Sequence, residues 1–328
     1  MSGGDRALLS RPLVRLASAV VATAVLGLAV WAAGARAVLT DLGSSLHVVP
    51  VLAVLEAVML GCSTVALRCL YGASGSAVPV REWCRVAAAG YAVGLVLPMG
   101  RGSGEAVRAV ILGRTLGGAR AAVAAVQMQA LTLLSTAVFA LPILVATLVF
   151  LPPGLMAGFI VLNTLITTTV GTAILVLRQR SSPGRRLGGL FKRLAPFGAA
   201  FDAASGASRG ELVRSLVWET GGRIAQVVQC AVVLSAFGQP AGLLRVLVVR
   251  GALMVGSALG DILPGQFGAT EATLVAGAAA LGLSAASAAS LALLIHGAQI
   301  ALGLLCAALS FALPGSRRPA VGEAEAAP

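Results

Sequence analysis

Residues 97–106 read Leu-Pro-Met-Gly-Arg-Gly-Ser-Gly-Glu-Ala, and residues 263–272 read Leu-Pro-Gly-Gln-Phe-Gly-Ala-Thr-Glu-Ala. Both stretches fit the pattern L-P-x-x-x-G-x-x-E-A at a spacing of 166 residues (263 − 97). Proline and clustered glycine interrupt helices. Each stretch therefore predicts a break between two helices, with a new helix beginning close to the glutamate.

The chain around these breaks is too apolar for a soluble protein. Of its 328 residues, 58% are hydrophobic and only 11% are charged, against about 25% charged in soluble domains. Apolar runs of about 20 residues match a hydrocarbon core about 30 Å thick. Because lipid offers the backbone no hydrogen-bond partner, the sequence predicts an all-α polytopic membrane protein with eight hydrophobic segments. These are residues 16–35, 46–67, 86–99, 121–150, 155–177, 211–237, 243–263 and 286–313.

The positive charges predict the orientation of the chain. There are 24 Lys and Arg against 12 Asp and Glu, and the cations cluster in short loops beside apolar runs. That placement indicates membrane orientation rather than nucleic-acid binding. The basic stretch 178–214 and the N-terminus are both expected in the cytoplasm, with the chain in the cytoplasmic membrane, so an even number of crossings must separate them. The segment 86–99 is about 21 Å long as a helix, and we expect 86–116 to form a re-entrant hairpin.

The two breaks also predict an internal duplication. If each half has three spans and one hairpin, the odd number of crossings inverts the second copy, as in inverted-repeat transporters. The expected organisation begins with a cytoplasmic N-terminus at 1–15, with residues 16–35 as an uncleaved span rather than a signal peptide. A first membrane repeat at 16–150 and a second at 151–313, which contains the basic loop 178–210, follow. Residues 314–328 are expected to form a disordered cytoplasmic tail.

The charged and glycine residues at the breaks are the candidate substrate-binding site. Charges at the centre of a bilayer cost about 2.5–3.5 kcal/mol each and usually face a cavity or a partner. Free N–H groups at helix starts and guanidinium groups suit a phosphate-bearing lipid headgroup. The alternative is that the carboxylates cap helices and the arginines anchor the hairpin. The candidates are Arg101, Gly102, Gly104, Glu105, Arg108, Gly265, Gly268 and Glu271.

Four further charges inside spans are candidate supporting residues. Glu219 and Arg223 are four residues apart on one helix face and form either an ion pair or part of a polar pathway. Glu56 is a possible proton site, and Asp261 is a possible partner for an arginine. The five cysteines form no C-x-x-C pair. No metal site, cofactor or catalytic set is predicted.

These motifs resemble the lysylphosphatidylglycerol synthase transmembrane family. Pro98, Gly100-Arg101, Gly104-Glu105 and Arg108 are similar to the family's first motif, and Pro264-Gly265, Gly268 and Glu271-Ala272 match its second. Relatives often carry an E-R-x-x-D cluster in the following span, whereas residues 126–132 here hold no charge. The family's soluble aminoacyl-transfer domain is also missing, so a stand-alone member is expected.

The resemblance implies a flippase or transporter for an anionic, aminoacylated or polyprenyl-phosphate-linked lipid, and no enzymatic activity. One alternative is an intramembrane lipid-modifying enzyme with Glu105 or Glu271 as acid or base. Another is a non-catalytic partner subunit of a lipid synthase or glycosyltransferase, docked through the basic loop.

Overall fold

The computed structural model describes residues 20–97, 100–180, 185, 195–204, 206–261, 263 and 266–313. The predictions for the N-terminus 1–15, for most of the basic loop 178–210 and for the tail 314–328 fall outside these residues. Within the described ranges, all regular elements are helical. The all-α prediction is therefore confirmed for this part of the chain.

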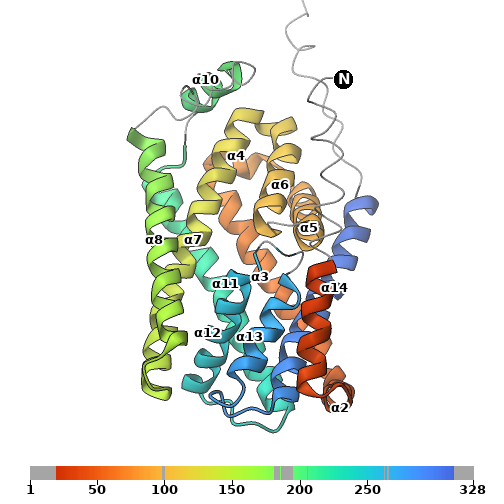
Figure 1. Ribbon diagram of the computed structural model, residues 1–328. Coiled ribbons are helices and arrows are strands. Elements are labelled where there is room, and N and C mark those ends of the chain that lie inside the picture. Colours follow the sequence, from red (N-terminus) through yellow and green to blue (C-terminus); the bar gives the residue numbers. More distant parts are fainter. Residues whose placement is uncertain are drawn as a thin grey trace, which may run out of the picture.

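The first described helix is Val20–Ala33. The helices that follow it along the chain include the two pairs that the breaks separate (Figure 1). The elements are α2 (Ala35–Ser45), the 3-10 turn η1 (Leu46–Val48), α3 (Val49–Leu70), α4 (Gly72–Ala77), α5 (Val80–Val96), α6 (Gly100–Leu116), α7 (Gly118–Phe150), α8 (Leu155–Arg180), α10 (Ala195–Ala203), α11 (Arg209–Ala236), α12 (Leu243–Leu259), α13 (Ala269–Gly277) and α14 (Ala285–Ala312).

Four of these segments are long and apolar enough to cross a membrane. They are Ala35–Leu70, Gly118–Phe150, Leu155–Leu177 and Ala285–Ala312. Helix α11 is also long, with 28 residues, but Glu219 and Arg223 interrupt its apolar character. The arrangement of six crossings and the inverted repeat stay predictions, because helix length and composition alone do not fix them.

Each predicted break separates two helices that pack against each other. Helix α5 contacts α6, and α12 contacts α13. In Figure 1, α5 and α6 lie in the upper half of the molecule beside α4, whereas α12 and α13 lie in the lower half. The sequence thus located both breaks, while their re-entry into a membrane stays a prediction.

Glycine allows the two helices of each pair to approach closely. A Cβ added to Gly104 of α6 would lie 2.6 Å from the carbonyl oxygen of Gly90 on α5. A Cβ on Gly256 of α12 would lie 2.7 Å from the Cα of Thr270 on α13. Small residues drive this kind of helix contact in membranes, where van der Waals packing replaces the hydrophobic effect.

The glycine-rich stretch of the first motif is helical rather than broken. Helix α6 begins at Gly100, so Gly102 and Gly104 are inside it, and Leu97 has the extended conformation that ends α5. The expectation that the glycines themselves form the break was wrong. The lack of a side chain at Gly104 serves the contact with α5 instead.

Helix α12 lies at the centre of the larger apolar core. Its buried residues include Val246, Val249 and Leu253, which join buried residues of α7, α11 and α14. Helix α8, in contrast, packs against α7 and leaves large apolar side chains such as Leu155 and Leu165 exposed. An apolar outer face of this kind is what a lipid-exposed helix requires.

Candidate functional site

A cavity of about 350 Å³ lies between the two breaks. Gly102 and Gly104 line it from the first break, and Gln266 lines it from the second. Its walls come from α3, α5, α6, α7, α11, α12 and α14, with Asn163 from α8 and Thr270 from α13. The charged residues that line it are Glu56, Glu105, Arg108, Glu219, Arg223, Arg250 and Asp261.

The first break contributes an ion pair to the cavity. Arg108 Nη1 lies 2.8 Å from Glu105 Oε1, one turn earlier on α6, and 3.5 Å from the hydroxyl of Ser63 on α3. Both charged side chains are largely buried, with Arg108 only 6% exposed. The side chain of Arg108 lies against Gly90. A Cβ added to Gly90 would be 2.6 Å from the Nε atom of Arg108. Gly90 therefore leaves the space that this buried arginine occupies.

Helix α11 presents a polar stripe to the same cavity. Glu219, Arg223, Gln226 and Gln229 follow one another at intervals of three or four residues, so they share one helix face. Arg223 donates to the carbonyl oxygen of Thr132 at 3.2 Å and to the hydroxyl of Thr136 at 2.7 Å.

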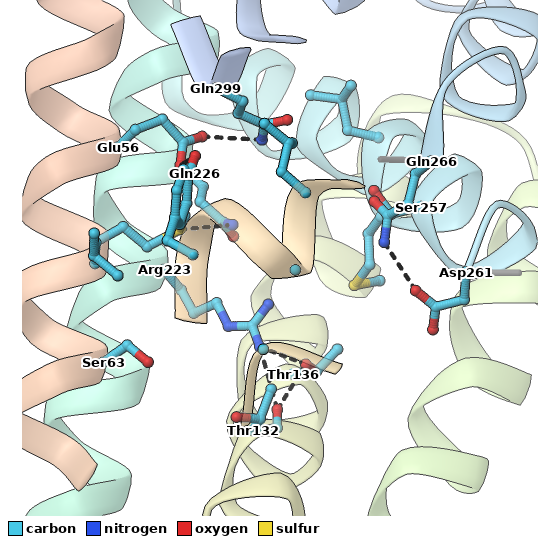
Figure 2. A pocket seen from close by; sticks show the side chains of 18 of the residues that line it. Glu56, Ser63, Thr132, Thr136, Arg223, Gln226, Ser257, Asp261, Gln266 and Gln299 are labelled. Atoms are coloured by element: carbon cyan, nitrogen blue, oxygen red, sulfur yellow. Dashed lines mark hydrogen bonds between the residues drawn. The ribbon is translucent and has the colours of Figure 1, made fainter. Parts of the chain in front are cut away.

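Glu219 accepts a hydrogen bond of 3.3 Å from the hydroxyl of Thr132. Figure 2 shows Arg223 reaching from α11 towards Thr132 and Thr136 of α7. Glu219 and Arg223 therefore both contact α7 at Thr132, and both line the cavity.

Glu56 is buried in the wall that α3 provides, with 1% of its surface exposed. Its Oε1 atom accepts hydrogen bonds from the amides of Gln229 at 3.2 Å and Gln299 at 3.1 Å. Its Oε2 atom accepts one from the hydroxyl of Tyr91 at 3.4 Å. Residues from α3, α5, α11 and α14 thus meet at one carboxylate.

The second break contributes an amide–carboxylate contact to the cavity. Asp261 accepts a hydrogen bond of 2.8 Å from Gln266 (Figure 2), in place of the arginine considered from the sequence. Gln266 has a φ of 62°, a left-handed conformation that non-glycine residues rarely adopt. Arg250 of α12 donates to Gln226 at 2.6 Å. Asp261 and Gln266, which lie on the two sides of the second break, thus both line the cavity.

Glu271 does not line the cavity, although its motif matches that of Glu105. It is fully buried, its Oε2 accepts from the N–H of Gly268 at 2.8 Å, and its Oε1 lies 2.7 Å from Nδ1 of His296. Through the first contact it caps the start of α13. His296, packed edge-on against Phe267, lies between Glu271 and the cavity, which it lines.

Gly268 also lies away from the cavity. Its φ of 84° is left-handed, and a Cβ there would lie 2.8 Å from the carbonyl oxygen of Ala22 in the first helix. Its role in this structure is to let the second break pack on that helix. The side chain of Arg101 and the whole of Gly265 fall outside the described residues.

The structure therefore brings together Gly102, Gly104, Glu105 and Arg108 with the supporting residues Glu56, Glu219, Arg223 and Asp261. Sequence reasoning did not assign Thr132, Thr136, Gln226, Gln229, Arg250 or Gln299 to the site. The stripe on α11 is the signal that could have revealed part of this set, because polar residues at helical spacing in a membrane segment face a cavity or a partner.

The cavity has the chemistry of a binding site for a polar group. It offers guanidinium groups and amides as donors, and carboxylates as acceptors, inside an apolar helix bundle. Its volume falls within the range of about 300–1,000 Å³ for ligand pockets. In the described part of the chain, no group of three or more His, Cys, Asp or Glu residues is arranged to hold a metal ion.

One known protein family matches most of the chain. The family described as the lysylphosphatidylglycerol synthase TM region matches residues 15–307. Neither a curated protein nor a solved structure matches the chain. The match includes both breaks and every helix that lines the cavity. This chain is therefore a multi-pass membrane protein that belongs to the lysylphosphatidylglycerol synthase transmembrane family.

Proposed function

We propose that the protein is a flippase that moves a lipid with a phosphate-bearing headgroup across the cytoplasmic membrane. The headgroup enters the cavity between the two breaks, while the acyl or prenyl chains stay in the bilayer. An anionic, aminoacylated or polyprenyl-phosphate-linked lipid has the required chemistry. The family, which ties the chain to lipid handling, is consistent with this class of substrate.

The observation that carries the proposal is the cavity itself, in which helix breaks and buried charges meet. Discontinuous helices at the meeting point of two hairpins are the usual substrate site of inverted-repeat transporters. Arg108 and Arg223 supply guanidinium groups that form charge-assisted hydrogen bonds with a phosphate. Glu105 neutralises Arg108 when no headgroup is bound, and it can pair with an amino group when one is.

Two other functions make different demands on the same residues. An intramembrane lipid-modifying enzyme would use Glu105 as its acid or base, but that carboxylate forms an ion pair with Arg108. Glu271 is separated from the cavity by His296. A partner subunit for a synthase or glycosyltransferase needs a docking surface rather than a buried charged cavity. The flippase accounts for more of the observed side chains than either alternative.

Reconstitution in liposomes tests the proposal. Purified protein is placed in phosphatidylcholine vesicles that contain a trace of fluorescent phosphatidylglycerol, and transfer between leaflets is followed with a membrane-impermeant quencher. We expect protein-dependent transfer that Glu105→Gln slows by roughly 10- to 100-fold, because Arg108 then lacks the carboxylate that neutralises it once the phosphate has left. That range corresponds to about 1.5–3 kcal/mol for one hydrogen bond to a charged group.

Glu82→Gln is the matched control variant. Glu82 is buried on α5 and pairs with Arg85 three residues later, as Glu105 pairs with Arg108, but it does not line the cavity. It should transfer lipid at the unmutated rate. Equal rates for Glu105→Gln and the unmutated protein, both folded, would contradict the headgroup site. Transfer only after addition of a synthase would favour the partner-subunit function, and a chemically altered lipid would favour the enzyme.

A further inference from the structure

Glu56 is the buried carboxylate for which the headgroup site provides no role. A charge in the middle of a membrane helix costs about 2.5–3.5 kcal/mol. The contacts of Glu56 are all with neutral groups, namely the amides of Gln229 and Gln299 and the hydroxyl of Tyr91. Three hydrogen bonds to one carboxylate, contributed by three other helices, indicate a site built around this group.

Three other carboxylates inside the bundle have a partner that carries or can carry a positive charge. Glu105 pairs with Arg108, Glu82 with Arg85, and Glu271 contacts His296. Among the described residues, Glu56 forms no such pair with an arginine or a histidine. Adding a proton to Glu105 would remove an ion pair, whereas adding one to Glu56 removes none. Glu56 is therefore a buried carboxylate of this cavity that can change charge without losing a salt bridge.

The amides around Glu56 can serve both of its protonation states. The ionised carboxylate only accepts hydrogen bonds, whereas the protonated form must donate one. An amide side chain that turns over presents its oxygen in place of its nitrogen, and so accepts instead of donating. Gln299 suits this change because its hydrogen bond in the described structure is to Glu56, whereas Gln229 also donates to the carbonyl oxygen of Leu52.

Glu56 also connects parts of the chain that a transport cycle would have to move. Gln229 and Gln299 are 173 and 243 residues away from it in sequence. Tyr91 lies on the helix that precedes the first break, and α14, which carries Gln299, packs against both α5 and α13. A change in the hydrogen bonds of Glu56 thus acts on both hairpins at once.

The ionisable groups that face Glu56 come from each neighbouring helix. Those that line the cavity with it are Tyr91 on α5, the Glu105–Arg108 pair on α6, Glu219 and Arg223 on α11, Arg250 on α12, Asp261 after that helix, and His296 on α14. Helix α7 lines the cavity with Gln129, Thr132, Leu133 and Thr136, none of which is ionisable. His47 of η1 contacts the carbonyl oxygen of Ser44 and does not line this cavity.

We propose that Glu56 is a proton-binding site that couples movement of the headgroup to a proton gradient, which rests on the proposed lipid transport. The carboxylate takes up one proton while the cavity is open to one side of the membrane and becomes a neutral carboxylic acid. The same proton leaves when the cavity opens to the other side, and the carboxylate returns. One proton crosses the membrane in each cycle, and no other group gains or loses a covalent bond.

Infrared titration tests the proton site without any transport assay. We expect the unmutated protein to show a carboxylic-acid carbonyl band that grows as the pH falls, and Glu56→Gln to lack that component. Glu82→Gln, whose carboxylate pairs with Arg85 outside the cavity, should keep it. A band that is unchanged in folded Glu56→Gln would overturn the proposal.

Transport under imposed gradients tests the coupling. In the vesicles described above, a pH gradient should change the rate of fluorescent phosphatidylglycerol transfer for the unmutated protein, for Glu82→Gln and for Glu56→Asp, which keeps an ionisable group. The response should be lost in Glu56→Gln. A full response in folded Glu56→Gln, or a response to a sodium gradient alone, would contradict the proposal. If the unmutated protein transfers no lipid while the infrared band titrates at Glu56, the proposed transport fails and the proton site stands.

Discussion

The two breaks share a sequence pattern but use its glutamate differently. Glu105 is one turn inside α6 and lines the cavity, whereas Glu271 is near the start of α13, fully buried, and caps that helix. The difference follows from the residue three positions later. Arg108 in the first motif corresponds to Leu274 in the second (108 + 166), so Glu105 finds its cation on its own helix and Glu271 takes its partner, His296, from α14.

This comparison teaches that a repeated motif can place a break between helices in both copies without preserving the local backbone or the site. Gly102 is inside α6, whereas its counterpart Gly268 has a φ of 84° before α13. Both glutamates follow a break, and both breaks bring two helices into close contact at a glycine. Yet only the first break places its glutamate in the cavity. The second break reaches the cavity through Asp261, Gln266 and Thr270, and the partner of Glu271, His296 of α14, also lines it.

The largest expected effect is on stability at the second break. Glu271→Ala leaves the N–H of Gly268 and the ring nitrogen of His296 without their buried partner. Each such group costs about 1–3 kcal/mol, which gives about 2–6 kcal/mol in total. We expect a large fall in the thermal midpoint of the purified protein in detergent. A midpoint unchanged in Glu271→Ala would show that Glu271 is not structural, and the contrast with Glu105 would disappear.

The next effect compares one glycine from each motif. Gly268→Ala places a Cβ in a left-handed residue and 2.8 Å from the carbonyl oxygen of Ala22, and the conformation alone costs about 1–2 kcal/mol. Gly102→Ala, in contrast, meets no atom within 4 Å. Thermal unfolding of the two variants should therefore show a clear loss for Gly268→Ala and little change for Gly102→Ala. The reverse order would contradict the assignment of Gly268 to packing and Gly102 to the cavity.

The smallest effect is the coupling between Glu105 and Arg108. Arg108→Leu copies the residue of the second motif and leaves Glu105 without its cation. Adding Glu105→Gln should recover part of the lost stability, with a coupling energy of about 0.5–3 kcal/mol, as contacting pairs usually show. The double variant should stay as inactive in lipid transfer as either single one. Strictly additive stability losses would mean that the ion pair contributes nothing to the fold.

The sequence predicted the features that depend on local chemistry. Apolar runs identified the longest helices, and proline with glycine located both breaks. The cost of charge inside a membrane brought Glu105 and Arg108 forward as candidates for one site, although not as an ion pair. All of these follow from residues close together in the chain.

Features that depend on tertiary contacts were not predicted. The helical state of Gly100–Gly104 depends on the close approach of α5 at Gly90. The burial of Glu271 depends on His296, 25 residues later. The cluster at Glu56 depends on Gln229 and Gln299, which lie on α11 and α14. Only the stripe from Glu219 to Gln229 on α11 could have been recognised from spacing alone.

The central position of α12 has a consequence for the biogenesis of the protein. Chains are synthesised from the N-terminus, so α12 and Glu271 reach the membrane before α14 does. Until residue 296 is made, the carboxylate of Glu271 has no histidine, and the face of α12 that packs against α14 has only lipid or the insertion machinery to contact. A chain that is released after truncation between residues 272 and 296 therefore leaves the carboxylate of Glu271 in the membrane without its histidine.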